Sequence, residues 1–168
     1  IAENKVMPSG VLSWRLLRLW WMLPLCFYGM ELCHESGHLA AGWLTGAAGM
    51  QLEWLPWSFT RTAFAVNPHP LAVVWSGPLA GILLPLALWR LGKNRRGEPR
   101  LRFFAGFCLL ANGVYIGLGS FDRTGDCLEM AAAGTPSWVM LSFGLLAGSA
   151  GLWLWHGLKR AAPPSAAA

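Results

Sequence analysis

The chain has 168 residues, of which 55% are hydrophobic and only 12% are charged, and it contains 20 glycines and 11 tryptophans. This composition is typical of a small membrane protein with several spans, and we expect no separate soluble domain. The formal net charge of +5 comes from arginines and lysines grouped at a few points, so it indicates membrane orientation and argues against a nucleic-acid partner.

Four apolar segments are long enough to cross the hydrocarbon core of a bilayer, which takes about 20 helical residues. They run from about Trp14 to Thr45, Pro70 to Leu91, Leu101 to Ser120 and Pro136 to Leu158. The pattern predicts an all-α integral membrane protein with about four transmembrane helices, in which residues 1–168 form a single transmembrane domain. No cleavable signal peptide is expected, because the first apolar run continues without a cleavage site.

The segment from Ala47 to Pro68 is too short and too broken to span the membrane. Residues 54–59 contain two tryptophans, a proline and a phenylalanine, and apolar and polar residues alternate around Thr60 to Val66. We therefore expect a short membrane-associated hairpin, re-entrant or interfacial, between the first two spans.

Basic residues precede the first span, fill the connection between the second and third spans, and follow the fourth. The positive-inside rule therefore places both termini and that connection in the cytoplasm. The expected location is the inner membrane of a bacterium.

The first span carries an H-E-x-x-H box, His34-Glu35-Ser36-Gly37-His38. In a helix the two histidines lie one turn apart on the same face, close enough to share one ion, and Glu35 lies beside them. Ionisable groups at membrane depth are costly unless they are paired or bound to a metal. The box therefore predicts a zinc site with an adjacent base.

A catalytic zinc usually takes three protein ligands and leaves a fourth position for water, so one ligand remains to be found. His34 follows Arg18 by roughly 24 Å of helix, which places the box near the outer side. The third span reaches that side just before Asp122 and Asp126. Gly125 allows the chain to break and aim a carboxylate inward, so Asp126 is the first candidate and Asp122 the second. Alternatively, both aspartates end a helix in water.

These residues resemble the site-2 protease family of intramembrane zinc metalloproteases. In that family an H-E-x-x-H box lies on one transmembrane helix, and an aspartate from a later helix completes the zinc site. The element from Ser76 to Gly81 is similar to the family's Gly-Pro element, on the helix that follows a membrane-associated hairpin. The order and spacing of these elements agree over about residues 20–130.

Two motifs depart from the family's pattern. The family commonly has Asn where this chain has Gly81, and its third motif usually reads Asn, then Pro, then Asp-Gly. Here Asn112 precedes Asp126 by 14 positions, and Cys127 replaces the glycine. The resemblance implies a substrate-binding role for Asn112 and identifies Asp126 as the third zinc ligand.

Glu31 falls one helical turn before Glu35 and shares its face. It could orient a ligand histidine through the free ring nitrogen, or it could be an ordinary buried carboxyl.

The reaction that the resemblance implies is hydrolysis of a peptide bond in or near a transmembrane helix. Zn²⁺ held by His34, His38 and Asp126 would polarise the scissile carbonyl, and Glu35 would take the proton from the attacking water. A helical substrate must first unwind, and an edge strand at Thr60 to Val66 could hold it extended.

A different class of function fits the same residues, namely a structural or assembly subunit of a larger membrane complex that has the protease fold, with or without zinc and activity. The altered third motif favours this alternative, in which partner helices replace the substrate. We would then expect a neighbouring chain to order the tail from Ala161 to Ser165. A transporter is a weaker alternative, because the sequence has no internal repeat.

Overall fold

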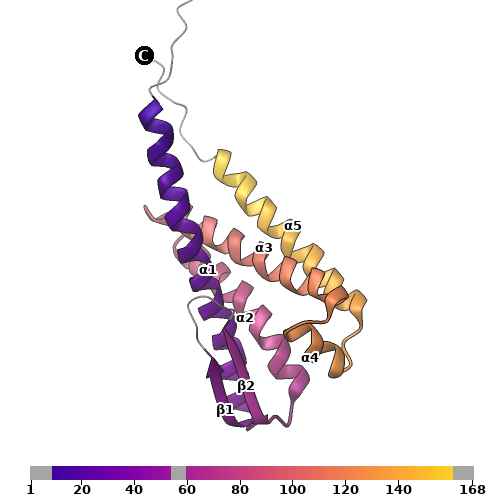
Figure 1. Cartoon of the computed structure of the whole chain (residues 1–168). Coiled ribbons are helices and arrows are strands. Elements are labelled where there is room, and N and C mark those ends of the chain that lie inside the picture. The colour runs from indigo at the N-terminus through magenta and orange to yellow at the C-terminus, as the bar shows by residue number, and fades with distance from the viewer. Residues whose placement is uncertain (1–8, 54–59, 161–168) are drawn as a thin grey trace, which may run out of the picture.

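The computed structural model describes residues 9–53 and 60–160, with side chains described between residues 21 and 158. The aromatic part of the expected hairpin at residues 54–59 and the tail from Ala161 to Ser165 lie outside this part of the chain. The described residues form five helices and one two-stranded sheet (Figure 1). In chain order the elements are α1 (Ser9–Thr45), β1 (Ala48–Glu53), β2 (Arg61–Val66), α2 (Pro70–Leu91), α3 (Glu98–Asp122), α4 (Asp126–Ala132) and α5 (Ser137–Arg160).

Three of the described helices are long and apolar enough to cross a membrane, namely α2, α3 and the Ser137–Leu158 part of α5. They correspond to the second, third and fourth expected spans. The described part of α1, the expected first span, is not among them; this part contains Glu31 and the H-E-x-x-H box. The described part of the chain is therefore mostly helical, with three helices suited to a membrane.

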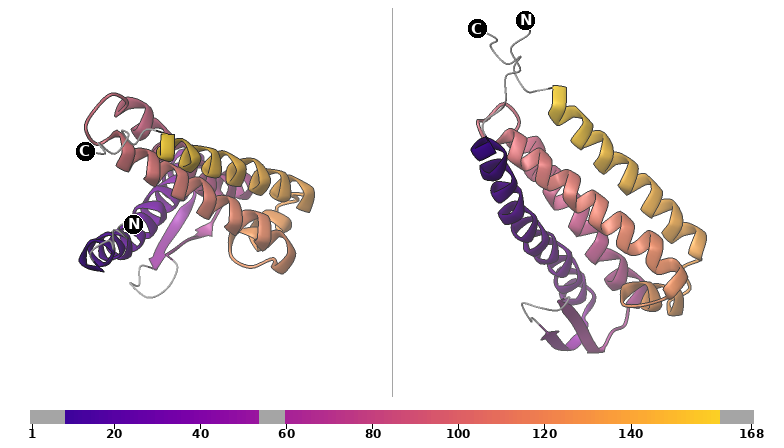
Figure 2. Two further views of the ribbon diagram at one scale, coloured as in Figure 1. Left: turned by 90° about the horizontal axis from the view of Figure 1, so that it is seen from above. Right: turned by 45° about the horizontal axis from the view of Figure 1, so that its top comes forward.

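The long helices contact one another in the order α1, α2, α3, α5 (Figure 2). α1 packs along α2, whereas its contact with α3 is slight. α4 and the β1–β2 hairpin lie at the same end of the helices (Figure 1).

Glycines allow the backbones of α3 and α5 to contact each other. A Cβ atom on Gly144 would lie 2.6 Å from the Cα of Gly117 and 2.7 Å from the carbonyl oxygen of Gly113. A Cβ on Gly151 would lie 2.8 Å from the carbonyl oxygen of Gly106. Small residues at such positions are how membrane helices gain van der Waals packing without a hydrophobic driving force.

We predict that Gly144→Ala destabilises the protein by about 1–3 kcal/mol, because the added methyl group meets α3 backbone that cannot rotate away. Thermal unfolding in detergent would show the loss. Gly148→Ala is the matched control, since a Cβ at Gly148 meets nothing within 4 Å. Equal stability of the two variants would contradict close packing of α3 on α5.

The segment between α1 and α2 contains two antiparallel strands, paired from Ala48 with Val66 to Glu53 with Arg61. The ring of Phe64 on β2 fills the space that a side chain at Gly42 of α1 would occupy. β1 is exposed along its whole length. The hairpin is therefore held against α1 through β2, which brings the start of β2 beside the middle of α1.

Sequence analysis did not predict α4, whose seven residues are too few to show a helical period. α3 ends at Asp122, and Arg123 follows in the left-handed conformation with φ 51°. Gly125 then has φ 53° and ψ −133°, a combination that favours glycine. Cys127 and Met130 are buried, so α4 packs back onto the helices instead of continuing outward.

Candidate metal centre

His34 and His38 are buried on one face of α1, and both rings have a fixed orientation. The Nδ1 atom of His34 lies 2.8 Å from the Oδ1 atom of Asn112, and the Nδ1 atom of His38 lies 2.8 Å from the carbonyl oxygen of Val73. The amide nitrogen of Asn112 donates to the carbonyl oxygen of Cys108, which turns Oδ1 toward the histidine. Both rings therefore donate their Nδ1 protons and direct their Nε2 atoms into one space.

Asp126 at the start of α4 completes this arrangement. Its Oδ2 atom lies 2.8 Å from the Nε2 atom of His34 and 3.4 Å from the Nε2 atom of His38. Zinc–nitrogen bonds of about 2.0–2.1 Å place tetrahedral ligand atoms about 3.3 Å apart, so the spacing fits a zinc ion after a small adjustment. Rings that donate from Nδ1 contact Asp126 favourably in two ways: with a further proton on Nε2, which makes the contact a hydrogen bond, or with a metal ion between the Nε2 atoms and the carboxylate.

Glu35 belongs to the same cluster. The ligand atoms of His34, Glu35 and His38 all lie within 4.8 Å of one another, so these three residues could hold a metal ion. One oxygen of Glu35 accepts a 2.5 Å hydrogen bond from the hydroxyl group of Thr62 on β2. The carboxylate is therefore tied to the hairpin on one side and adjoins the histidines on the other.

Gly77 on α2 leaves room for this cluster because glycine has no side chain. A Cβ on Gly77 would overlap the ring of His38 and lie 2.7 Å from the Nε2 atom of His34. A Cβ on Gly37 would overlap the backbone of Ser76, so α1 and α2 cross in close contact at this point. The amide of Asn112 occupies the corresponding space beside Gly81.

At the start of α4, the pKa values favour a charged Asp126 carboxylate and a neutral Cys127 thiol. Burial by itself would raise the pKa of Asp126, but the hydrogen bonds to His34 and His38 outweigh this effect and hold the pKa well below its usual value. Burial, with a smaller effect of Asp126, raises the pKa of the Cys127 thiol to about 11. Cys127 is fully buried and contacts α3, so it anchors α4 and is not suited to bind a metal.

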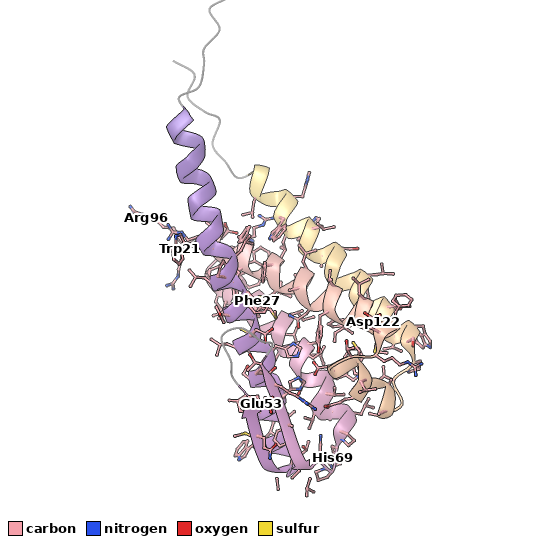
Figure 3. The ribbon with its side chains drawn as sticks, viewed as in Figure 1. Trp21, Phe27, Glu53, His69, Arg96 and Asp122 are labelled. Carbon is pink, nitrogen blue, oxygen red and sulfur yellow. The ribbon has the colours of Figure 1, made fainter. Side chains whose placement is uncertain are left out.

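Two of the candidate site residues lie apart from the histidine nitrogens, and Glu31 has the surroundings of an ordinary buried carboxyl, one of its two predicted roles. Asp122, the second choice for the third ligand, is exposed at the end of α3 (Figure 3). Glu31 does not bond to a histidine, since Asn112 and Val73 occupy both Nδ1 atoms; its carboxylate instead accepts the backbone N–H of Thr60 at 3.1 Å. An i, i+4 spacing showed that Glu31 shares the face of Glu35, but it could not show which partner would reach it.

A cavity of about 590 Å³ opens onto the cluster. Its walls come from α1, α3, α4 and the start of β2. The metal-site residues line one part, and Phe27, Met30, Val114 and Leu128 supply an apolar part. The cavity thus combines a polar centre with space for an apolar group beside it.

Neither protein-family models, nor curated proteins, nor solved structures gave a match to this chain. The functional assignment therefore depends on the geometry of the site.

Sequence reasoning missed the parts played by Thr62 and Tyr115, and it gave Asn112 a different role. Thr62 bonds to Glu35, and Tyr115 accepts the backbone N–H of Asp126 at 3.1 Å. These contacts join residues far apart in the chain, so no local spacing in the sequence predicts them. The side chain of Asn112 is 1% exposed and bonded to His34, which makes it a partner of a candidate ligand.

We predict that Asn112→Ala weakens zinc binding about 10- to 100-fold, as is typical when the partner of a metal-binding histidine is removed. Without the amide, the His34 ring loses its Nδ1 acceptor and its orientation. Competition with a chromophoric chelator measures the affinity. Asn67→Ala serves as the control, because Asn67 bonds only locally, to the backbone of His69. Unchanged zinc affinity in Asn112→Ala would remove Asn112 from the centre.

Proposed function

We propose that the protein is an intramembrane zinc metalloprotease of the site-2 protease type, which hydrolyses a peptide bond in or near a transmembrane helix. The observation that carries this proposal is the convergence of the two Nε2 atoms of His34 and His38 on one oxygen of Asp126, with Glu35 beside them at a cavity. Two imidazoles, one carboxylate and an adjacent glutamate are the groups that metal-assisted peptide hydrolysis uses.

The proposed membrane topology has α1 as a fourth span and the hairpin at the outer surface. Arg96, in the basic connection between α2 and α3, lies toward the opposite end of the helices from Glu53 and His69 (Figure 3). With the basic connection in the cytoplasm, the metal centre lies near the outer side, where water can reach it. Both termini are then cytoplasmic.

The chemistry divides among the residues of the site. Zinc, when bound to His34, His38 and Asp126, supplies a Lewis acid and a water of lowered pKa. Glu35 accepts the proton of the attacking water and delivers it to the nitrogen of the leaving amine. Thr62 holds one oxygen of Glu35, so the carboxylate keeps its direction while the proton moves.

The cavity supports the choice of a membrane substrate. Its apolar part, from Phe27 and Met30 on α1 to Val114 on α3, lies where these two helices make little contact. An extended apolar peptide segment fits such a space better than a charged, water-soluble one does. The start of β2 forms one wall, and in the described sheet β2 pairs with β1 along one edge, so its other edge suits an added peptide strand.

We predict that Glu35→Gln retains zinc and lowers cleavage at least about 100-fold, since the amide cannot take the proton. Cleavage of a single-span membrane protein in vesicles, together with the zinc content of the purified protein, measures both effects. Glu53→Gln, an exposed carboxylate on β1, is the matched control and should cleave like the unsubstituted protein.

Cleavage by Glu35→Gln at the unsubstituted rate would exclude Glu35 as the base. Zinc binding without cleavage of single-span membrane proteins in vesicles would favour the structural subunit over the protease.

A further inference from the structure

Tyr115 on α3 touches both segments that the metal centre must bring together. Its ring meets the ring of His34 edge to face, with 6.0 Å between the centroids and an interplanar angle of 67°. Its hydroxyl oxygen accepts the backbone N–H of Asp126 at 3.1 Å. One side chain thus contacts a candidate ligand on α1 and the backbone of a candidate ligand on α4.

The turn before α4 is built around this hydroxyl group. Gly125 has a positive φ of 53°, and a Cβ at this position would overlap the Tyr115 oxygen. The N–H of Asp126 is in the first turn of α4 and has no acceptor within the helix. The hydroxyl group therefore fills the space that the missing side chain leaves and satisfies the N–H that the helix cannot.

The position of this backbone decides where the Asp126 carboxylate lies. α4 has only seven residues, so its own hydrogen bonds stabilise it weakly. Cys127 and Met130 attach its buried face to the core cluster with Ile116 and Met140. Those contacts hold the helix as a whole, whereas the Tyr115 hydroxyl fixes the residue that carries the carboxylate.

We propose that Tyr115 is a positioning residue of the metal centre, whose hydroxyl group seats the Gly125–Asp126 backbone so that Oδ2 of Asp126 reaches both histidines. The inference rests on the metal-binding part of the proposed function and does not depend on proteolysis.

The ring of Tyr115 also packs against the core cluster, so a substitution must separate packing from the hydroxyl group. Tyr115→Phe keeps the ring and removes only the oxygen. The chain contains one other tyrosine, Tyr28, which is on α1, pairs with Phe27 and is not among the residues that line the cavity. Tyr28→Phe removes the same atom elsewhere and is the matched control.

The test is the zinc affinity of the full chain in detergent, measured by competition with a chromophoric chelator. We expect Tyr115→Phe to bind zinc about 10- to 100-fold more weakly and Tyr28→Phe to match the unsubstituted protein. Equal affinity of Tyr115→Phe and the unsubstituted protein would overturn the inference while leaving the proposed protease intact. Absence of zinc binding by the unsubstituted protein would overturn both.

A double-substitution cycle tests whether Tyr115 acts through the turn. Gly125→Ala should weaken zinc binding by itself, and Tyr115→Phe should add little to it, because both changes displace the same backbone. Fully additive losses would overturn the inference.

A spectroscopic measurement covers the case in which Tyr115→Phe does not fold. The Tyr28→Phe protein, labelled with 3-fluorotyrosine, gives a single ¹⁹F resonance from Tyr115. Zinc should shift this resonance, and Gly125→Ala should raise the zinc concentration at which the shift is half complete. A resonance that zinc does not move, or a zinc titration that Gly125→Ala leaves unchanged, would overturn the inference.

Discussion

The site depends on the approach of one carboxylate oxygen of Asp126 to two imidazole nitrogens, at 2.8 Å from His34 and 3.4 Å from His38. The rings cannot turn to relieve the unfavourable contact, since Asn112 and Val73 hold their other nitrogens. A buried cluster of this kind needs a positive charge at its centre.

Glycines, which have no side chain, allow the histidines and Asp126 to come this close. Gly37 and Gly77 let α1 and α2 cross so closely that the histidine rings lie where a Cβ of α2 would be. Gly81 leaves space for Asn112, and Gly125 leaves space for the hydroxyl group of Tyr115. The glycines of this chain thus have two roles. Those between α3 and α5 allow close helix packing, and these four leave space for the candidate metal centre.

Local patterns in the sequence predicted the local parts of the structure. The spacing of His34 and His38 placed them on one face, and span lengths brought Asp126 to their level before any contact was known. Such reasoning could not predict the contacts of Glu31, Asn112 and Thr62, because their partners come from other elements and depend on how the helices cross. α4 was missed for a related reason, as tertiary contacts of Cys127 and Met130 stabilise it more than its own sequence does.

The glycine contacts between α3 and α5 contain none of the candidate metal ligands. α1, by contrast, is joined to α3 mainly through α2 and the cluster itself. An ion shared by His34 and Asp126, which stand 92 positions apart, would therefore act as a crosslink between the early and late halves of the chain. Chelation should therefore weaken the contact between α1 and α4 while the α3–α5 pair keeps its native packing.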